Sequence, residues 1–307
     1  MTESTTDIVR APFTDRPALS DPTTAILLRP MRCSQTLWRV VGVILGLSCA
    51  LQWVAMAMSD DPVRTFFTST VWSSVSFGVV ITQLHLVRGH TAMSELLGAQ
   101  AWRPVGVRVL RGTSLFGVSV VEVGDGVGPL RVFGASRAHL AVAVRTGTAW
   151  VVGPDGRGRA ALRLEGSHHA WPARVHRRPV KPARVPAADS DASAMWARQS
   201  RSWWKAPENR RLGELLGAGE WTKVSASLAP WQARMDGTTY GVATLRLPDG
   251  RVLLAAMPAA PVDVLGTVWD TGSLWLVGQP EPGRTLAVGF PGYPLLTAAT
   301  ICEATGV

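Results

Sequence analysis

Two long uncharged stretches near the start of the chain dominate its hydropathy pattern. Val40–Met58 contains 19 residues and Phe66–Val87 contains 22, and neither includes Asp, Glu, Lys or Arg. A helix needs about 20 mostly apolar residues to cross the hydrocarbon core of a bilayer. Only seven residues, 59–65, connect the two stretches. The pattern predicts a transmembrane helical hairpin over residues 37–90, rather than two buried helices of a soluble protein, which normally carry a polar face.

The flanking charges predict how this hairpin is oriented. Lys and Arg near the ends of a span tend to stay in the cytoplasm. The arginines that flank the hairpin are Arg29, Arg32, Arg39, Arg88, Arg103, Arg108 and Arg111. The short connection has one cation, Arg64, and two anions, Asp60 and Asp61. Both termini are therefore expected on the cytoplasmic side of the inner (plasma) membrane, with residues 59–65 outside.

The chain after the hairpin contains an internal repeat. The segment Glu95–Ala99, ELLGA, is followed by Trp102, and it returns as Glu214–Ala218 followed by Trp221, 119 residues later. A T-G-x-x-W-x-V-G pattern and Gly-Val, Asp-Gly and Gly-Arg steps recur in the same order. These pairs begin at Thr146 and Thr271, Gly117 and Gly241, Asp125 and Asp249, and Gly158 and Gly283. Ordered matches of this kind indicate that one structural unit is duplicated.

Each copy shows the two-residue alternation that is typical of half-buried strands. In the first copy the alternating positions are Val105, Val107, Val109, Val118, Val120, Leu140, Val142 and Val144. In the second copy the predicted strands cover residues 241–247, 252–257, 273–277 and 284–289. The Asp-Gly steps favour hairpin turns, because glycine tolerates the positive φ that these turns need. Five or six short strands predict a small barrel of SH3-like or OB-like size, preceded by a short helix over ELLGA.

These patterns predict a membrane protein of the α+β class, with an N-terminal two-helix transmembrane hairpin and two tandem, internally duplicated, small β-barrel-like domains. The expected parts are a flexible cytoplasmic tail (1–36), the hairpin (37–90), β-domain copy one (91–166), a basic Pro-rich linker with an amphipathic helix (167–206), β-domain copy two (207–292) and a C-terminal tail (293–307). The first segment is polar and lacks an apolar period, which favours disorder. The recurring tryptophans are expected in the cores, with a ligand-contact surface as the alternative. They are Trp102, Trp150, Trp221 and Trp275.

Positive charge is concentrated between the two copies. The chain has a net charge of +9, and residues 157–211 contain 13 cations against four anions. The segment 172–186, PARVHRRPVKPARVP, holds five of these cations among four prolines, which keep it extended. The five are Arg174, Arg177, Arg178, Lys181 and Arg184. We expect them to bind an anionic surface, either lipid headgroups or nucleic-acid phosphates, with a solvated linker as the alternative.

The segment 190–205, SDASAMWARQSRSWWK, has the pattern of an interfacial amphipathic helix. At helical spacing Trp196 and Trp203 share one face, and Trp204 follows directly. The cations on the opposite side are Arg198, Arg201 and Lys205. Aromatic side chains toward lipid and cations toward water predict a membrane-interface contact for the three tryptophans. The alternative is a helix that packs its tryptophans on a barrel.

The sequence contains no catalytic motif. It has no phosphate-binding loop, and its three cysteines, Cys33, Cys49 and Cys302, have neither a disulfide framework nor metal-ligand spacing. The adjacent His168 and His169 lack a carboxylate or cysteine partner in sequence and are a weak metal signal. We therefore expect no enzymatic activity, no cofactor and no metal.

One strand pattern carries a resemblance to known proteins. It consists of Asp249-Gly250 and the strand Gly272–Gly278, GSLWLVG. In this feature, and in the predicted hairpin, the chain resembles two-span membrane proteins of unknown role from high-GC Gram-positive (actinobacterial) bacteria with small cytoplasmic β-domains. This resemblance covers at most residues 37–290. The two predicted N-terminal spans give a fainter resemblance to septation membrane proteins of the SepX type, which implies a role in cell division or envelope assembly. Neither resemblance implies catalytic residues.

The whole pattern predicts a membrane-anchored, non-enzymatic scaffold or adaptor that presents its β-domains at the inner membrane face. The expected partners are the lipid bilayer, cytoplasmic or membrane proteins, and a second copy of the chain in a homo-oligomer. Nucleic acid is not expected, because the predicted strands do not interleave aromatic residues and cations as stacking platforms require. The alternatives are a membrane-tethered nucleic-acid-binding protein and a subunit of a transporter or membrane enzyme.

Overall fold

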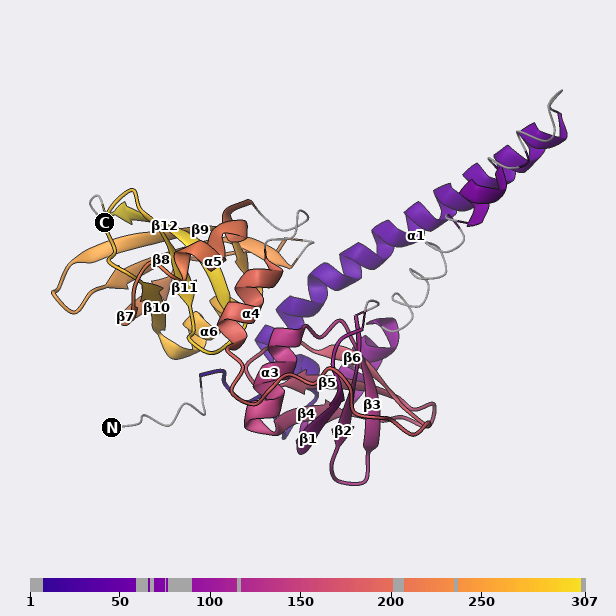
Figure 1. Cartoon of the computed structure of the whole chain (residues 1–307), viewed down its shortest axis with the longest axis horizontal. Helices are drawn as coiled ribbons and strands as arrows, with labels where there is room; N and C mark the ends of the chain where they lie inside the picture. The colour runs from indigo at the N-terminus through magenta and orange to yellow at the C-terminus, as the bar shows by residue number, and fades with distance from the viewer. Residues whose placement is uncertain are drawn as a thin grey trace.

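The computed structural model describes residues 8–58, 66, 69–74, 76, 90–114, 117–200, 207–234 and 237–304, with the backbone alone for 29–39. Two closed β-barrels form the globular part, and one long helix, α1, extends away from it (Figure 1). The prediction of two tandem small β-domains is confirmed.

Both barrels contain six antiparallel strands in the same spatial order. The first closes as β1-β2-β3-β6-β5-β4, from β1 (Arg103–Arg111), β2 (Val118–Val123), β3 (Gly128–Phe133), β4 (Thr148–Val152), β5 (Arg159–Leu164) and β6 (Trp171–Val175). The second closes as β7-β8-β9-β12-β11-β10, from β7 (Trp221–Leu228), β8 (Thr238–Arg246), β9 (Val252–Pro261), β10 (Ser273–Val277), β11 (Thr285–Gly289) and β12 (Leu296–Glu303). The helical elements around them are η2 (Ala18–Ser20), α3 (Arg137–Thr146), α4 (Ala192–Gln199), η3 (Pro207–Arg211), α5 (Leu212–Leu215) and α6 (Val262–Thr271).

The strand register repeats along with the strand order, as a duplication requires. Trp150 on β4 lies opposite Pro104 on β1, and Trp275 on β10 lies opposite Lys223 on β7. Both tryptophans are the third residue of their strand. The tryptophans do not share one degree of burial, because Trp102 is fully buried while the other three are half-buried.

A glycine in the left-handed region ends the helix that connects the third and fourth strands of each barrel. Gly147 ends α3 with a φ of 67°, and Gly272 ends α6 with a φ of 62°. The carbonyl of Gly147 accepts the N–H of Val107, and that of Gly272 accepts the N–H of Ala226. The repeated Thr-Gly step is therefore a helix C-cap, at which glycine is favoured because it adopts positive φ without a steric penalty.

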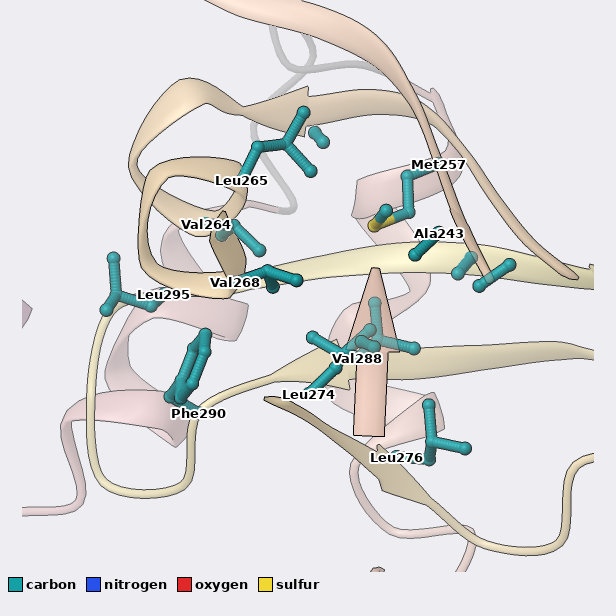
Figure 2. Close-up of a cluster of buried hydrophobic side chains, with 14 of the residues drawn as sticks. Ala243, Met257, Val264, Leu265, Val268, Leu274, Leu276, Val288, Phe290 and Leu295 are labelled. Atoms are coloured by element: carbon teal, nitrogen blue, oxygen red, sulfur yellow. The ribbon is translucent and has the colours of Figure 1, made fainter. Parts of the chain in front are cut away.

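The second barrel and α6 enclose a continuous hydrophobic core (Figure 2). Leu274 and Val288 extend from the strands toward Val264 and Val268 of α6. Three side chains of α3, the connecting helix of the first barrel, belong to the same buried cluster. They are Ala138, Ala141 and Val142. The two copies therefore share apolar burial, which stabilises their packing against each other.

The predicted strand over residues 140–144 is wrong, because this stretch lies in α3. All positions from Ala138 to Ala143 are buried, so the segment has apolar contacts on every side and no polar face that would reveal a helical period. The overlooked signals are the caps. Ser136 accepts the N–H of His139 at the helix start, and a glycine follows its end.

The barrels also extend beyond the expected domain boundaries. β6 lies past residue 166 in the expected linker, and β12 lies past residue 292 in the expected tail. Each is the strand that closes its barrel, since β6 pairs with β3 and β5, and β12 pairs with β9 and β11. An incomplete barrel would leave unpaired backbone groups at two open edges, so both segments are part of the folded domains.

The described part of the expected tail, residues 8–36, is folded. Ala18 and Leu28 lie in a buried cluster with side chains of the first barrel and of the helical residues 90–99. Helix α1 (Pro22–Ala57) begins within this region. The apolar side chains of residues 8–28 are few and widely spaced, so composition conceals them, but four of them are buried. They are Val9, Ala18, Leu27 and Leu28.

Among the described residues, one helix is long and apolar enough to cross a membrane, and it is α1. Its stretch Val40–Ala57 has no buried part. The second predicted span lies mostly outside the described residues, although residues 69–74 are helical and Trp53 Nε1 donates a hydrogen bond to Ser73 Oγ at 3.1 Å. The two-span hairpin stays a prediction.

Candidate functional site

Three arginines lie in one cross-strand row on the first barrel. Arg131 on β3 is directly opposite Arg174 on β6. On its other side Arg131 is opposite Val120 of β2, which is in turn opposite Arg111 at the end of β1. Residues opposite each other in adjacent strands project to the same side of the sheet. All three arginines are exposed, so they point outward from the barrel.

The Pro-rich segment after β6 is fixed to the same barrel. The N–H of His176 donates to the carbonyl of Pro129 at 2.8 Å. Farther along, Ala183 donates to the carbonyl of Leu110 at 3.1 Å and accepts the N–H of Gly112 at 3.0 Å. The segment is thus hydrogen-bonded to the barrel near both of its ends. It differs in this respect from a solvated linker, which would have no fixed contacts with the barrel.

The row and the segment together form a surface that we call the basic face. Its members are Arg111, Arg131, Arg174, Arg177, Arg178, Lys181 and Arg184. All seven are exposed, and within the described part of the chain none of them forms an ion pair. The pKa of His176 is lowered by partial loss of solvent and by the positive charges of Arg131, Arg111 and Arg178. Cations from two strands and from the segment thus lie close enough to His176 to affect its pKa together.

The structure brings the five predicted anion-binding residues together and adds two that the sequence analysis missed. Arg174 lies on a strand, while the other four lie on the segment behind it. Arg111 and Arg131 are distant in sequence from this run, and only the strand register places them beside it. No sequence signal short of the correct register could have found them. Anion binding itself stays a prediction.

The predicted membrane contact of α4 is wrong for Trp196. This side chain is half-buried and packs against the hydrophobic clusters of the second barrel. Its ring also meets the His139 ring edge-on, with centroids 5.6 Å apart. The alternative prediction, a helix that packs on a barrel, applies here. The Trp196 ring lies between His139 of α3 and the second barrel, where it is more shielded from water than it would be at a membrane interface. Trp203 and Trp204 lie outside the described residues.

A buried polar junction joins α1 to both barrels, and Arg163 of β5 is at its centre. The Arg163 side chain is 1% exposed. Its guanidinium donates to Asp21 Oδ2 at 3.2 Å, to the carbonyl of Ser167 at 2.9 Å and to the carbonyl of Arg10 at 2.7 Å. Asp21 is the N-cap of α1. The membrane-helix candidate is therefore bound to the first barrel by a charged pair shielded from water.

The loop after β5 extends this junction to α6 of the second barrel. Ser167 Oγ donates to Asp263 Oδ2 at 2.7 Å. His168 Nδ1 lies 3.3 Å from the Arg163 guanidinium, and its Nε2 lies 3.2 Å from Thr267 Oγ1. Because arginine can only donate, Nδ1 accepts and the proton of the neutral ring is on Nε2. Both ring nitrogens are occupied, which leaves His168 without a free atom for a metal.

Burial sets the protonation of the junction. The pKa of His168 is held well below its usual value, first by burial and then by the positive charge of Arg163. Burial raises the pKa of Asp270, which lies 3.9 Å from His168 Nε2. A pocket of about 280 Å³ opens beside these groups, and its rim includes Trp269, which is 68% exposed.

The described residues contain no group of three His, Cys, Asp or Glu side chains that could hold a metal ion. One serine and one histidine resemble a nucleophile and its base, since Ser136 Oγ lies 2.7 Å from His139 Nδ1. Ser136 caps α3, however, and the edges or faces of Trp171 and Trp196 contact the His139 ring. Both groups are buried in the packing of α3 and are closed to a substrate.

Comparisons of the chain with protein families, with curated proteins and with solved structures found no match.

Proposed function

We propose that this chain is a membrane-anchored, non-enzymatic scaffold or adaptor that holds two fused β-barrels at the inner face of the membrane. The observation that carries the proposal is the polar junction at Arg163, which fixes the start of an exposed apolar helix to both barrels at once. The junction gives the barrels a defined position relative to the helix. A role in cell division or envelope assembly is part of the proposal and rests on the resemblance alone.

The packing of the N-terminal region supports the two-span hairpin as part of this proposal. The segment before α1 and the helical residues 90–99 share a buried cluster that contains Ala18, Leu28 and Leu97. Both ends of the predicted hairpin therefore belong to one folded body, which supports a topology with both of them on one side of the bilayer. If Val40–Ala57 crosses the membrane, the chain has to cross back before residue 90. The uncharged stretch 66–87 is long enough to do so.

The barrels favour partner contacts through loops, helices and faces. Every strand in the two barrels is paired on both sides, so neither offers a free sheet edge to a partner strand. Large apolar side chains remain exposed on the second barrel, with Trp269 at 68% and Tyr240 at 53%. Tryptophan and tyrosine are frequent anchors of protein interfaces, which supports protein partners over a small-molecule substrate.

The test is purification of the full chain from membranes in a mild detergent, followed by identification of what remains bound. We expect a protein partner in a reproducible ratio that survives size-exclusion chromatography and is lost in Trp269→Ser or Tyr240→Ser. Retention of that partner in both variants would move the contact elsewhere. Recovery of lipid alone from repeated mild extractions would contradict the scaffold, and co-purifying nucleic acid would favour the alternative of a tethered nucleic-acid-binding protein.

A further inference from the structure

We infer that the basic face of the first barrel binds the anionic lipid headgroups of the same bilayer that holds α1, so that this barrel lies against the membrane surface. The inference rests on the proposed anchoring by α1. It adds a second, electrostatic contact, assigns it to one barrel only, and includes Arg111 and Arg131 in it.

The duplication shows that the arginine row is not a requirement of the barrel fold. The Gly-Val steps at Gly117 and Gly241 align β2 with β8, and the strand registers then give equivalent rows. The first barrel has Arg111, Val120, Arg131 and Arg174, and the second has Ser227, Thr244, Leu254 and Cys302. The second barrel closes in the same order without a cation in this row. The barrel can therefore close without the three arginines, which favours a binding role for them.

The backbone of the basic face is fixed, and no carboxylate among the described residues forms an ion pair with its seven side chains. Hydrogen bonds from His176 and Ala183 fix the segment to the barrel, and the carbonyl of Arg184 lies so close to Gly112 that a side chain at that glycine would collide with it. Holding seven like charges on one side of a small barrel is unfavourable in isolation. The repulsion between these charges is relieved most when the surface faces a continuous layer of negative charge.

A bilayer fits this surface better than a nucleic acid does. No Trp, Tyr or Phe belongs to the arginine row or to residues 176–184, so the face lacks the aromatic platforms that bind single strands. The apolar part of α1 already fixes the barrel near lipid, which makes the headgroup contact effectively intramolecular. Figure 1 shows α1 leaving the globular part on the side of the view where β3 and β6 lie. Because the contact is effectively intramolecular, one weak attraction per cation is sufficient to hold the basic face against the headgroups.

The lysines of the chain provide the measurement. There are only three, and they are Lys181 on the basic face, Lys205, and Lys223 on β7. The full chain is reconstituted in lipid nanodiscs of either pure phosphatidylcholine or phosphatidylcholine with phosphatidylglycerol. A small amine-reactive acetylating reagent is added, and the modification rate of each lysine is followed by mass spectrometry. Lys223, which is exposed, serves as the internal reference.

We expect Lys181 to react about fivefold more slowly in the phosphatidylglycerol discs than in the neutral discs, because cations near an anionic surface are individually attracted to it. High salt should restore the rate by screening, and Lys223 should react equally in both discs. Arg111→Gln/Arg131→Gln/Arg174→Gln should abolish the protection. Arg246→Gln/Arg251→Gln, on exposed positions of the second barrel, should leave it unchanged.

Equal reactivity of Lys181 in the two kinds of disc would overturn the inference. Protection of Lys181 by an added single-stranded oligonucleotide in the phosphatidylglycerol discs, at physiological salt, would also overturn it in favour of nucleic acid. Failure of the chain to enter discs at all would instead contradict the anchoring by α1. The two proposals therefore fail in distinguishable ways.

Discussion

At the scale of single residues, Arg163 connects more parts of the chain than any other side chain described above. Its partners come from the N-terminal segment, from the cap of α1 and from the loop that reaches α6. A buried guanidinium is tolerated only when its charge and its donors are satisfied. Here one carboxylate, two carbonyls and the Nδ1 of His168 satisfy the guanidinium, so that a change at any one of them affects the others.

Arg163→Leu should therefore destabilise the folded chain strongly. It leaves the Asp21 carboxylate buried without its counter-charge, a change that typically costs about 3–5 kcal/mol. Thermal unfolding of the full chain in detergent would show the loss as a lower midpoint. Arg284→Gln, which removes an exposed pair with Glu281, is the control and should change stability by about 0–1 kcal/mol. Equal midpoints for the two variants would show that the junction is not a fixed link.

The repeated tryptophans allow a second test, because one pair of equivalent positions differs in burial. Trp102 is fully buried, whereas its counterpart Trp221 is half-buried. Trp102→Ala should destabilise the chain by about 3–5 kcal/mol, as expected for a large ring removed from a core. Trp221→Ala should have a clearly smaller effect in the same denaturation experiment. The reverse order would indicate that Trp221 has a packing role that its exposure conceals.

The junction also predicts a dependence of stability on pH. The folded-state pKa of His168 is well below 6.5, so the unfolded chain takes up this proton first as the pH falls below 6.5. The contribution of His168 to the free energy of unfolding is therefore fully present above pH 6.5 and decreases as the pH falls below that value. His169, whose pKa is also lowered, acts in the same direction. Asp270 acts in the opposite direction at lower pH, because its raised pKa lets the folded state bind a proton first.

His168→Gln should flatten this dependence while it keeps a polar group in the site. We expect the melting midpoint of the variant to fall less than that of the unaltered chain between about pH 7.5 and about pH 5.5, the range in which an ordinary histidine titrates. Parallel curves for the two proteins would show that His168 does not titrate differently in the folded and unfolded states.

At the scale of elements, the contact between the barrels depends on a glycine. Gly166 has a φ of 77°, and a Cβ at this position would collide with the ring of Tyr293 from the second barrel. Tyr293 is also held by Arg145 of α3, whose guanidinium lies 5.0 Å from the ring centroid. The loop after β5 and the loop before β12 therefore fit together only when residue 166 has no side chain.

Gly126 offers a matched control for this contact. It has nearly the same φ, 76°, but a Cβ there would meet nothing within 4 Å. Gly126→Ala should destabilise the chain by about 1–2 kcal/mol through backbone strain alone. Gly166→Ala should add about 1–3 kcal/mol for overpacking, measured by denaturant unfolding of both variants. Equal effects would mean that the two barrels separate at little expense and do not form one rigid unit.

The elements also show what the sequence could predict. The Asp-Gly turns, the strand 273–277 and the first ELLGA helix follow from local rules and agree with the structure. The second ELLGA segment agrees only in part, because α5 ends at Leu215 and residues 216–218 form a turn and a bend. Helix α3 does not, because its neighbours bury it on all sides and thereby remove its polar face. The sequence pattern places the closing strands β6 and β12 in a linker and a tail for a related reason, since only barrel closure identifies them. It predicts the part of the basic face that follows β3 in sequence, from Arg174 to Arg184, whereas only the strand register adds Arg111 and Arg131.

At the scale of the whole molecule, the N-terminal segment and the barrels form one body from which α1 leaves. A helix rises about 1.5 Å per residue, so the 36 residues of α1 span about 54 Å. The first half, residues 22–39, begins at the junction with the first barrel. The second half, Val40–Ala57, is apolar and exposed. The hairpin prediction then requires that residues on either side of it share one side of the membrane and that residues 59–65, which lie outside the described residues, are on the other.

The scarcity of lysine makes this topology testable with two conservative variants. All three lysines follow the hairpin, so an amine reagent that cannot cross membranes should modify none of them in intact right-side-out vesicles. Arg64→Lys places a lysine in the predicted outer connection and should be modified there without permeabilisation. Arg88→Lys places the same side chain just after the second stretch and should react only after permeabilisation. Because both variants keep the positive charge, they should not disturb the orientation rule itself. Peptide mass spectrometry distinguishes the two sites, and equal modification of both in intact vesicles would show that residues 66–87 do not return the chain across the bilayer.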